Sequence, residues 1–206
     1  MPDMKPNIIL ITTDQQRFDT MGRAAPDWMQ TPNYWHLCYE GVEFTRAYSD
    51  CPLCVPARLT IMTGKAADRH GMRGNGRSYT VLDDEGTLPT ELRRLGYQTA
   101  AIGKMHFYPQ RKRHGFEEML IPQDYFNEMR DSGYPLRPMS TGLSQTELSA
   151  SMSTVPEAKT LTHCTAEKSA HYIRERRDPT KPFFLWTSFG KPHPPFDPPE
   201  PYWSFY

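Results

Sequence analysis

The chain has 206 residues, and its 24 lysines and arginines balance 24 aspartates and glutamates, so the formal net charge is zero. This length predicts one domain or part of a larger one, and the neutral charge argues against a nucleic acid or an anionic membrane surface as partner. No apolar run approaches the roughly 20 residues that span a bilayer, and the start lacks the apolar segment of a secretory signal. Four cysteines are also too few for a disulfide scaffold. We therefore expect a cytoplasmic protein.

The first predicted element is a strand over residues 7–13. This continuous apolar and β-branched run is typical of a strand that is buried on both faces of a parallel sheet. Asp14 follows directly, so its carboxylate lies at the carboxyl end of the strand. In open α/β sheets, ligands bind at that end.

Two helices and a short strand are predicted next. A helix is expected over residues 31–41, because it opens with a proline at the first helical position and stops at a glycine. The alternating pattern of residues 42–47 predicts a short strand. Residues 56–62 predict a helix that ends at Gly64, with Cys54 just before its start.

The second half of the chain continues the alternation of helices and strands. A short helix over residues 88–95 precedes a second buried strand over 97–102, and an amphipathic helix over 162–177 precedes a third over 182–189. The region 107–160 has a weak pattern and predicts a long loop or insertion with at most short helices. These elements predict an α/β fold whose mostly parallel central sheet is flanked by helices, without an internal domain boundary.

Polar side chains follow each of the three predicted strands. They are Asp14 after the first, Lys104 and His106 after the second, and Lys191 and His193 after the third. In a parallel sheet these ends share one edge, and a spacing of two residues in extended chain points both side chains the same way. Each Lys-x-His pair therefore offers a cation and an imidazole, which suit an anionic group and a proton donor for a leaving oxygen.

Cys54 lies at the entrance to the helix over 56–62. Free backbone N–H groups favour an anion there, and Arg58 can reach back toward the same place. Taken alone, Cys51 and Cys54 also fit a redox pair or half of a zinc site. However, the sequence has no second pair at zinc-finger spacing, and the local pattern lacks the βαβ context of a thioredoxin-like pair.

The motifs together resemble those of type I sulfatases, which are formylglycine-dependent members of the alkaline-phosphatase-like superfamily. Residues 54–64 resemble the C-x-P-A-R motif and its threonine-glycine stop, and residues 6–17 look like the first strand with its metal-binding aspartate. Residues 31–44, 103–106 and 191–196 are similar to the family's first helix with the strand that follows and to its two basic anion-binding segments. The resemblance covers essentially the whole chain.

This resemblance implies a specific chemistry on small-molecule sulfate esters. A formylglycine-generating enzyme would oxidise Cys54 to formylglycine, whose aldehyde hydrates to a geminal diol. One hydroxyl, activated by a divalent metal, attacks sulfur and expels the alcohol, and the second lets the aldehyde re-form as sulfate leaves. A serine lacks that second hydroxyl. Asp14, Gln15 and position 54 would bind the metal, and oxygen-rich coordination favours Ca²⁺, with Mg²⁺ or Mn²⁺ as alternatives.

The resemblance also implies roles for the basic residues. Arg58 would steady the diol, and Lys104 with His106 would hold the sulfate and the formylglycine hydroxyl. His193 would be the partner of the leaving oxygen, and Lys191 is a weaker candidate for contact with sulfate.

Two departures from the family pattern keep alternatives open. Many members carry paired aspartates where this chain has Asp14 and Gln15, which also fits a phosphonate or phosphate monoester hydrolase of the same superfamily. The chain is also shorter than the family enzymes, so we expect residues 1–206 to be the N-terminal part of a catalytic domain that is inactive in isolation. A truncated, non-catalytic relative would instead keep Cys54 as a thiol.

Overall fold

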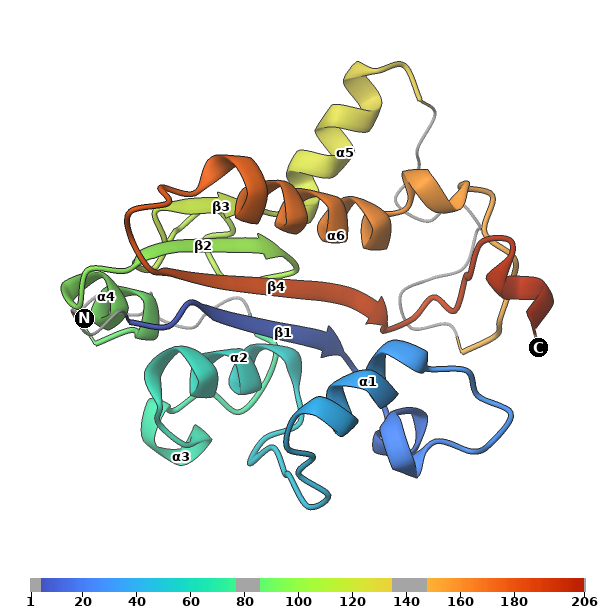
Figure 1. Cartoon of the computed structure of the whole chain (residues 1–206), viewed down its shortest axis with the longest axis horizontal. Coiled ribbons are helices and arrows are strands. Elements are labelled where there is room, and N and C mark those ends of the chain that lie inside the picture. The colour runs from blue at the N-terminus through green and yellow to red at the C-terminus, as the bar shows by residue number, and fades with distance from the viewer. Residues whose placement is uncertain (1–4, 77–85, 135–147, 206) are drawn as a thin grey trace.

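The computed structural model describes residues 5–76, 86–134 and 148–205. Its centre is a parallel four-stranded sheet in the order β1-β4-β2-β3, which runs through the middle of Figure 1. The strands span Ile8–Asp14 (β1), Gln98–Gly103 (β2), Glu118–Leu120 (β3) and Phe183–Pro192 (β4). The predicted α/β class with a parallel central sheet is confirmed.

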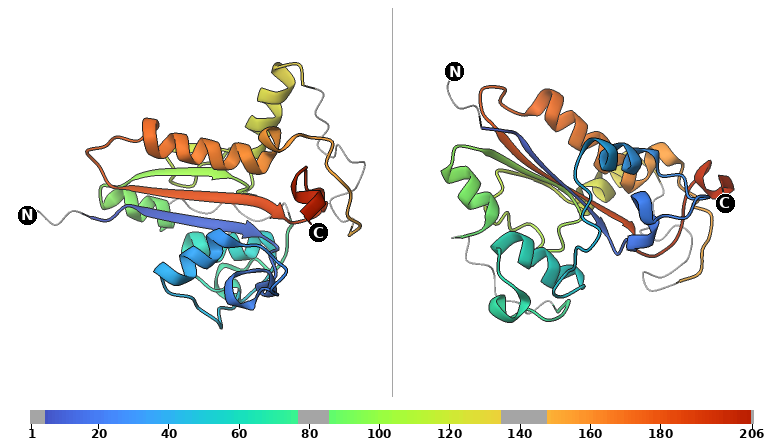
Figure 2. Two further views of the ribbon diagram at one scale, coloured as in Figure 1. Left: turned by 45° about the vertical axis from the view of Figure 1, so that its right-hand side comes forward. Right: turned by 60° about the horizontal axis from the view of Figure 1, so that its bottom comes forward.

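Helices cover both faces of this sheet. The views of Figures 1 and 2 agree that α6 lies on one face, with α1 and α2 on the other. No helix within the described ranges is long and apolar enough to cross a membrane. The helices are α1 (Pro32–Glu40), α2 (Cys54–Thr63), α3 (Ala67–His70), α4 (Leu88–Arg94), α5 (Pro122–Asp131) and α6 (Leu161–His171), which a π-helical turn continues over Tyr172–Arg176.

The side chains of β4 divide the core into two layers. Phe184 and Trp186 point to one face, where they pack with Met62 of α2. Leu185 points to the other face and packs in a cluster with Tyr172, at the end of α6. All five side chains are at most 4% exposed. Apolar burial of this kind contributes about 25 cal/mol per Å², so β4 is the best anchored strand of the sheet.

The expectation that the first strand is buried on both faces is wrong for one face. Ile9 is 48% exposed and Ile11 is 59% exposed. Across the β1–β4 pair, Ile9 lies opposite Leu185 and Ile11 lies opposite Thr187. β1 lies at the edge of the described sheet, and α6 packs over β4 and β2 rather than over β1.

Three further expectations from the sequence need correction. Residues 42–47 form no strand, because no described strand lies beside them to supply a hydrogen-bonding partner. The region 107–160 is not only loop, since it contains β3 and the ten-residue helix α5; its residues 135–147 lie outside the described part. Cys54 does not precede its helix but is the first residue of α2.

Candidate active site

The three predicted strand ends do meet at one edge of the sheet. β1, β2 and β4 are parallel neighbours, and their carboxyl ends point to the right in Figure 1. A register shift after Thr13 places Asp14 opposite Pro192. This shift brings Asp14 beside His193, the next residue along the chain. One ligand atom each of Asp14, Cys54 and His193 lies within 4.8 Å of the other two.

The carboxylate of Asp14 is the centre of the cluster. One oxygen, Oδ2, lies 2.8 Å from Lys104 Nζ and 3.0 Å from Arg58 Nη2, while the thiol of Cys54 donates to Oδ1 at 3.3 Å. Burial acts to raise the pKa of Asp14, but the hydrogen bond and charge of Lys104 and the charge of Arg58 outweigh it. The pKa of Asp14 is therefore lowered, and its carboxylate is ionised at neutral pH.

Cys54 lies at the N-terminus of α2, where the helix has free N–H groups. The next N–H group, that of Val55, donates to Asn75 Oδ1 at 3.0 Å, which fixes the first turn. The helix ends at Gly64, whose left-handed backbone (φ 65°) closes the last turn as predicted. Burial raises the pKa of the Cys54 thiol, and the charge of Lys104 opposes this only in part. The unmodified side chain is therefore a neutral thiol.

Arg58 lies one turn after Cys54, on the side of α2 that faces the sheet. Its side chain is 7% exposed, and its guanidinium lies 5.9 Å from the centre of the Trp186 ring. Nη2 binds Asp14, whereas Nη1 donates to Ser188 Oγ at 2.9 Å and to the carbonyl of Lys104. The prediction that Arg58 reaches back toward the helix entrance is confirmed.

The close approach of β2 to β4 depends on Gly103. Its φ is +101°, and a Cβ atom there would lie 2.0 Å from the carbonyl oxygen of Ser188. The next residue, Lys104, donates its backbone N–H to that same oxygen at 2.8 Å. A larger residue would push the strands apart, so this glycine sets the position from which the Lys104 ammonium reaches Asp14.

The two histidines differ in their surroundings. Desolvation of the ring lowers the pKa of His106, and the positive charges of Lys104 and Arg58 add to this effect, so His106 is neutral at neutral pH. His193 Nδ1 lies 2.8 Å from the carbonyl oxygen of Pro194. A carbonyl accepts only, so Nδ1 carries the hydrogen and Nε2 is the basic nitrogen of the neutral ring.

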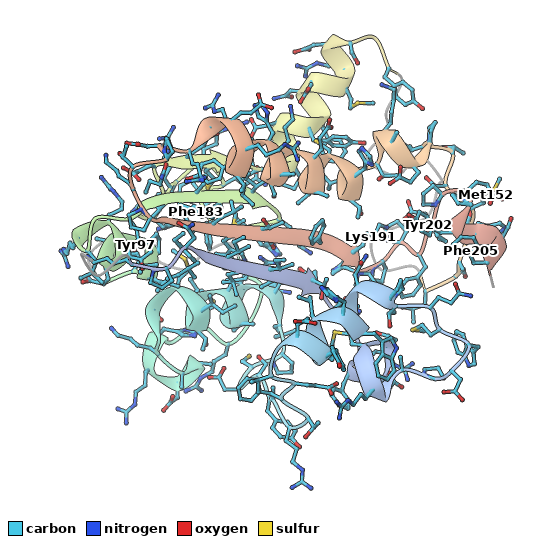
Figure 3. All side chains as sticks on the ribbon, in the orientation of Figure 1. Tyr97, Met152, Phe183, Lys191, Tyr202 and Phe205 are labelled. Atoms are coloured by element: carbon cyan, nitrogen blue, oxygen red, sulfur yellow. The ribbon has the colours of Figure 1, made fainter. Side chains whose placement is uncertain are left out.

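Two of the predicted site residues do not join the cluster. The ammonium of Lys191 pairs instead with the Asp197 carboxylate and the Pro195 carbonyl. Figure 3 shows Lys191 where β4 ends, beside the segment that holds Tyr202. Gln15 is exposed, with a left-handed backbone (φ 60°), and within the described residues its amide forms no hydrogen bond with Asp14.

The described residues fit a divalent metal only in part. Ca²⁺ prefers about six to eight oxygen ligands. The cluster supplies the Asp14 carboxylate, and oxidation of Cys54 would add oxygen at position 54. The positive charges of Arg58 and Lys104 oppose a further cation, so additional carboxylates would strengthen its binding.

Sequence reasoning missed three residues that shape this site. Ser188 holds Arg58, Asn75 holds the start of α2, and Asp197 holds Lys191. Ser188 follows an apolar run and Thr187 within β4, and a polar pair inside a buried strand is a detectable signal. The other two act from loops, and only the folded chain shows what they contact.

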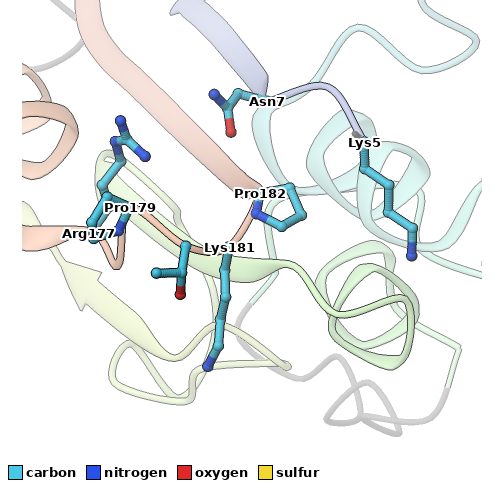
Figure 4. A pocket seen from close by; sticks show the side chains of 7 residues that line it. Lys5, Asn7, Arg177, Pro179, Lys181 and Pro182 are labelled. Atoms are coloured by element: carbon cyan, nitrogen blue, oxygen red, sulfur yellow. The ribbon is translucent and has the colours of Figure 1, made fainter. Parts of the chain in front are cut away.

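A separate hollow lies at the opposite end of the sheet. Lys5, Asn7, Arg177 and Lys181 line it, next to the amino ends of β1 and β4 (Figure 4). Two of its cations bind carbonyls of the chain, Lys5 that of Leu95 and Arg177 that of Ile173. The described residues that line it include no carboxylate, cysteine or histidine, so we do not assign it to the reaction.

Comparisons with known proteins agree with the motifs. The family model described as Sulfatase matches residues 6–205. An arylsulfatase of Clostridium perfringens is 33% identical to the chain, over 98% of this chain and 46% of that protein. A choline-sulfatase of Rhizobium meliloti is 31% identical, over 98% of this chain and 41% of that protein. The chain thus spans less than half the length of these curated relatives.

Solved structures show the same likeness. The crystal structure of a phosphonate monoester hydrolase of Agrobacterium radiobacter superposes with a TM-score of 0.81 at 26% identity, and the match covers 98% of this chain and 44% of that one. The arrangement of strands and helices is therefore that of the alkaline-phosphatase-like superfamily.

Proposed function

The chain belongs to the sulfatase family, and from this premise we propose that it carries the nucleophile of a hydrolase for sulfate monoesters. The observation that carries the proposal is the position of Cys54. It begins α2, donates to Asp14, and has Arg58 one turn away and Lys104 on the same carboxylate. Nucleophilic catalysis needs such a side chain beside groups that control its charge.

Oxidation of Cys54 to formylglycine is the modification we propose, and it makes a formylglycine-generating enzyme a partner in maturation. The modified residue supplies a hydrated aldehyde, one hydroxyl of which attacks sulfur while the other allows sulfate to be released. The raised pKa of Cys54 leaves the unmodified side chain a neutral thiol and so a weak nucleophile, and the hydroxyls of the modified residue would supply a stronger one.

The cations of the cluster suit an anionic substrate. Arg58 and Lys104 face the single carboxylate of Asp14, so one positive charge remains when the histidines are neutral. A sulfate monoester carries one negative charge. Lys104, whose side chain is 21% exposed, can reach a substrate oxygen, whereas Arg58 is buried and keeps the nucleophile in place.

The histidines would handle protons. Neutral His106 can accept a hydrogen bond from the hydroxyl at position 54. His193 directs its Nδ1 hydrogen to Pro194, so Nε2 carries no hydrogen in the neutral ring. Nε2 would donate to the leaving oxygen only after it has taken up a proton, that is, from the imidazolium form. Asp14 and Gln15 would contribute oxygens to a divalent metal, Ca²⁺ before Mg²⁺ or Mn²⁺, which when bound polarises the reacting oxygens.

A phosphonate monoester hydrolase is the second candidate. Two observations favour it: the TM-score of 0.81 with such an enzyme, and the neutral Gln15 beside Asp14. A phosphonate monoester also carries one negative charge, so the excess of one cation suits both substrates.

The test uses the full-length polypeptide made in its native host. Intact-mass measurement should show replacement of H₂S by O at Cys54, and kinetics on aryl sulfate and aryl phosphonate should show which ester is hydrolysed faster. Cys54→Ser should lose turnover, whereas Cys51→Ser, three residues away, should keep it. A wild-type protein with an unmodified Cys54 and no hydrolysis of either ester would refute the proposal in favour of a non-catalytic role.

A further inference from the structure

Ser188 lies where the three site-bearing strands come together. It pairs with Thr12 of β1 and with Gly103 of β2, and it is 0% exposed. A fully buried hydroxyl requires hydrogen-bond partners, because an unpaired one costs about 1–3 kcal/mol. Its partners determine what it can do for the site.

All the hydrogen-bonding capacity of this hydroxyl is used. Ser188 Oγ donates to the carbonyl of Lys104 at 2.6 Å and accepts from Arg58 Nη1 at 2.9 Å and from Thr12 Oγ1 at 3.0 Å. One donor and two acceptor sites are what a hydroxyl possesses. Thr12 Oγ1 in turn accepts from the Trp186 indole at 3.0 Å. The Lys104 carbonyl can only accept, so it takes the single hydrogen of Ser188, and Thr12 must donate to Ser188 while accepting from the indole.

This chain of hydrogen bonds ends on one side of the Arg58 guanidinium. Nη1 is held by Ser188 and by the Lys104 carbonyl, which leaves Nη2 directed at Asp14 at 3.0 Å. The guanidinium is planar and rigid, so holding one nitrogen sets the direction of the other. Ser188 thus controls the angle at which Arg58 meets Asp14, although within the described chain it forms no hydrogen bond with Asp14 or Cys54.

We propose that Ser188 is a positioning residue for the reaction assigned to Cys54, acting through Arg58; the inference rests on the proposed function. Replacing Ser188 by alanine removes the acceptor for Nη1 and the donor to Lys104. A hydrogen bond to a charged group contributes enough that its loss lowers the rate about 10- to 100-fold. The loss falls on kcat, because Arg58 supports the nucleophile rather than the substrate.

Ser169 offers a matched control. It is also a buried serine, 6% exposed, whose hydroxyl donates to the Thr165 carbonyl at 2.8 Å and accepts from Thr187 at 2.9 Å. It lies on α6, on the other face of the sheet. Ser169→Ala therefore removes an equivalent hydroxyl without touching Arg58.

The experiment measures kcat, KM and urea unfolding for the full-length enzyme and both alanine variants. We expect Ser188→Ala to lower kcat about 10- to 100-fold with KM nearly unchanged, and Ser169→Ala to leave both near wild type. If Ser188→Ala does not fold, Ser188→Cys fills the space with a weak donor and acceptor and should give an intermediate kcat. Equal losses in the Ser188 and Ser169 variants, or a change confined to KM, would overturn the inference.

A double-mutant cycle with Arg58→Lys separates positioning from a structural role. Arg58→Lys keeps the charge but lacks Nη1, so adding Ser188→Ala should change single-turnover rates less than about twofold. A full additional loss would show that Ser188 does not act through Arg58. An active wild type with an unaffected Ser188→Ala overturns this inference alone, whereas an inactive wild type overturns the proposed function as well.

Discussion

Replacing Asp14 by asparagine tests how the cluster is held together. The Asp14 side chain is 5% exposed and faces Arg58, which is 7% exposed, and Lys104, which is 21% exposed. Asp14→Asn keeps the shape and one accepting oxygen but removes the only negative charge among these three groups. Two cations then face each other with little water to screen them.

The expected cost follows from that burial. Removing one partner of a buried ion pair destabilises a protein by about 3–5 kcal/mol, because the other charge stays behind uncompensated. Part of Lys104 reaches water and the new amide still accepts a hydrogen bond, so the lower end, about 3 kcal/mol, applies here. This is a large share of the roughly 5–15 kcal/mol that holds a typical domain folded.

Urea unfolding of wild type and Asp14→Asn measures this difference. Asp19 provides a control, because it pairs with Arg17 at 2.5 Å but both side chains are exposed, so Asp19→Asn should change stability very little. Adding Lys104→Met to Asp14→Asn should restore part of the loss, since it removes one of the uncompensated cations. An Asp14→Asn chain as stable as wild type would refute the electrostatic account of the cluster.

The remaining predictions concern the rest of the fold. Burial raises the pKa of Tyr172 to about 12, above its ordinary value of 10.0, so this tyrosine stabilises the fold fully below pH 10 and loses that contribution as the pH rises toward 12. Urea midpoints at about pH 9 and about pH 11 should therefore differ less in Tyr172→Phe than in wild type. Gly103→Ala should fail to fold, which circular dichroism measures. Gly64→Ala should fold, because no heavy atom lies within 4 Å of the added Cβ, but the left-handed backbone (φ 65°) should lower the free energy of unfolding by about 1–2 kcal/mol. Ile9→Thr with Ile11→Thr should change Tm little, because both side chains are about half exposed, and a large fall in Tm would contradict their exposure.

The sheet and the meeting of its strand ends could be predicted because both depend on local sequence. A continuous apolar run is typical of a strand in a parallel sheet, and a polar residue directly after it lies at the strand end. The sequence alone therefore predicts that Asp14, Lys104 and His193 lie at one edge of the sheet. Arg58 was predicted as well, because it depends only on the helical spacing from Cys54.

The failures arise where a residue's surroundings come from distant segments. The alternation of residues 42–47 is a strand pattern, but a strand also needs a neighbour. Ile9 and Ile11 were predicted to be buried, because the sequence alone does not show that β1 lies at the edge of the described sheet. Lys191 was predicted at the site, but the chain turns after it and brings Asp197 into an ion pair with its ammonium.

The balance of charge in the cluster separates two tasks that a sulfatase site must perform. Arg58 and Lys104 against Asp14 leave a positive excess that holds an anion. The same excess works against a divalent cation, which would add two more positive charges within a few ångströms of these groups. If the proposed metal binds here, additional carboxylates beside Asp14 would favour it, because each would also neutralise part of the repulsion from Arg58 and Lys104.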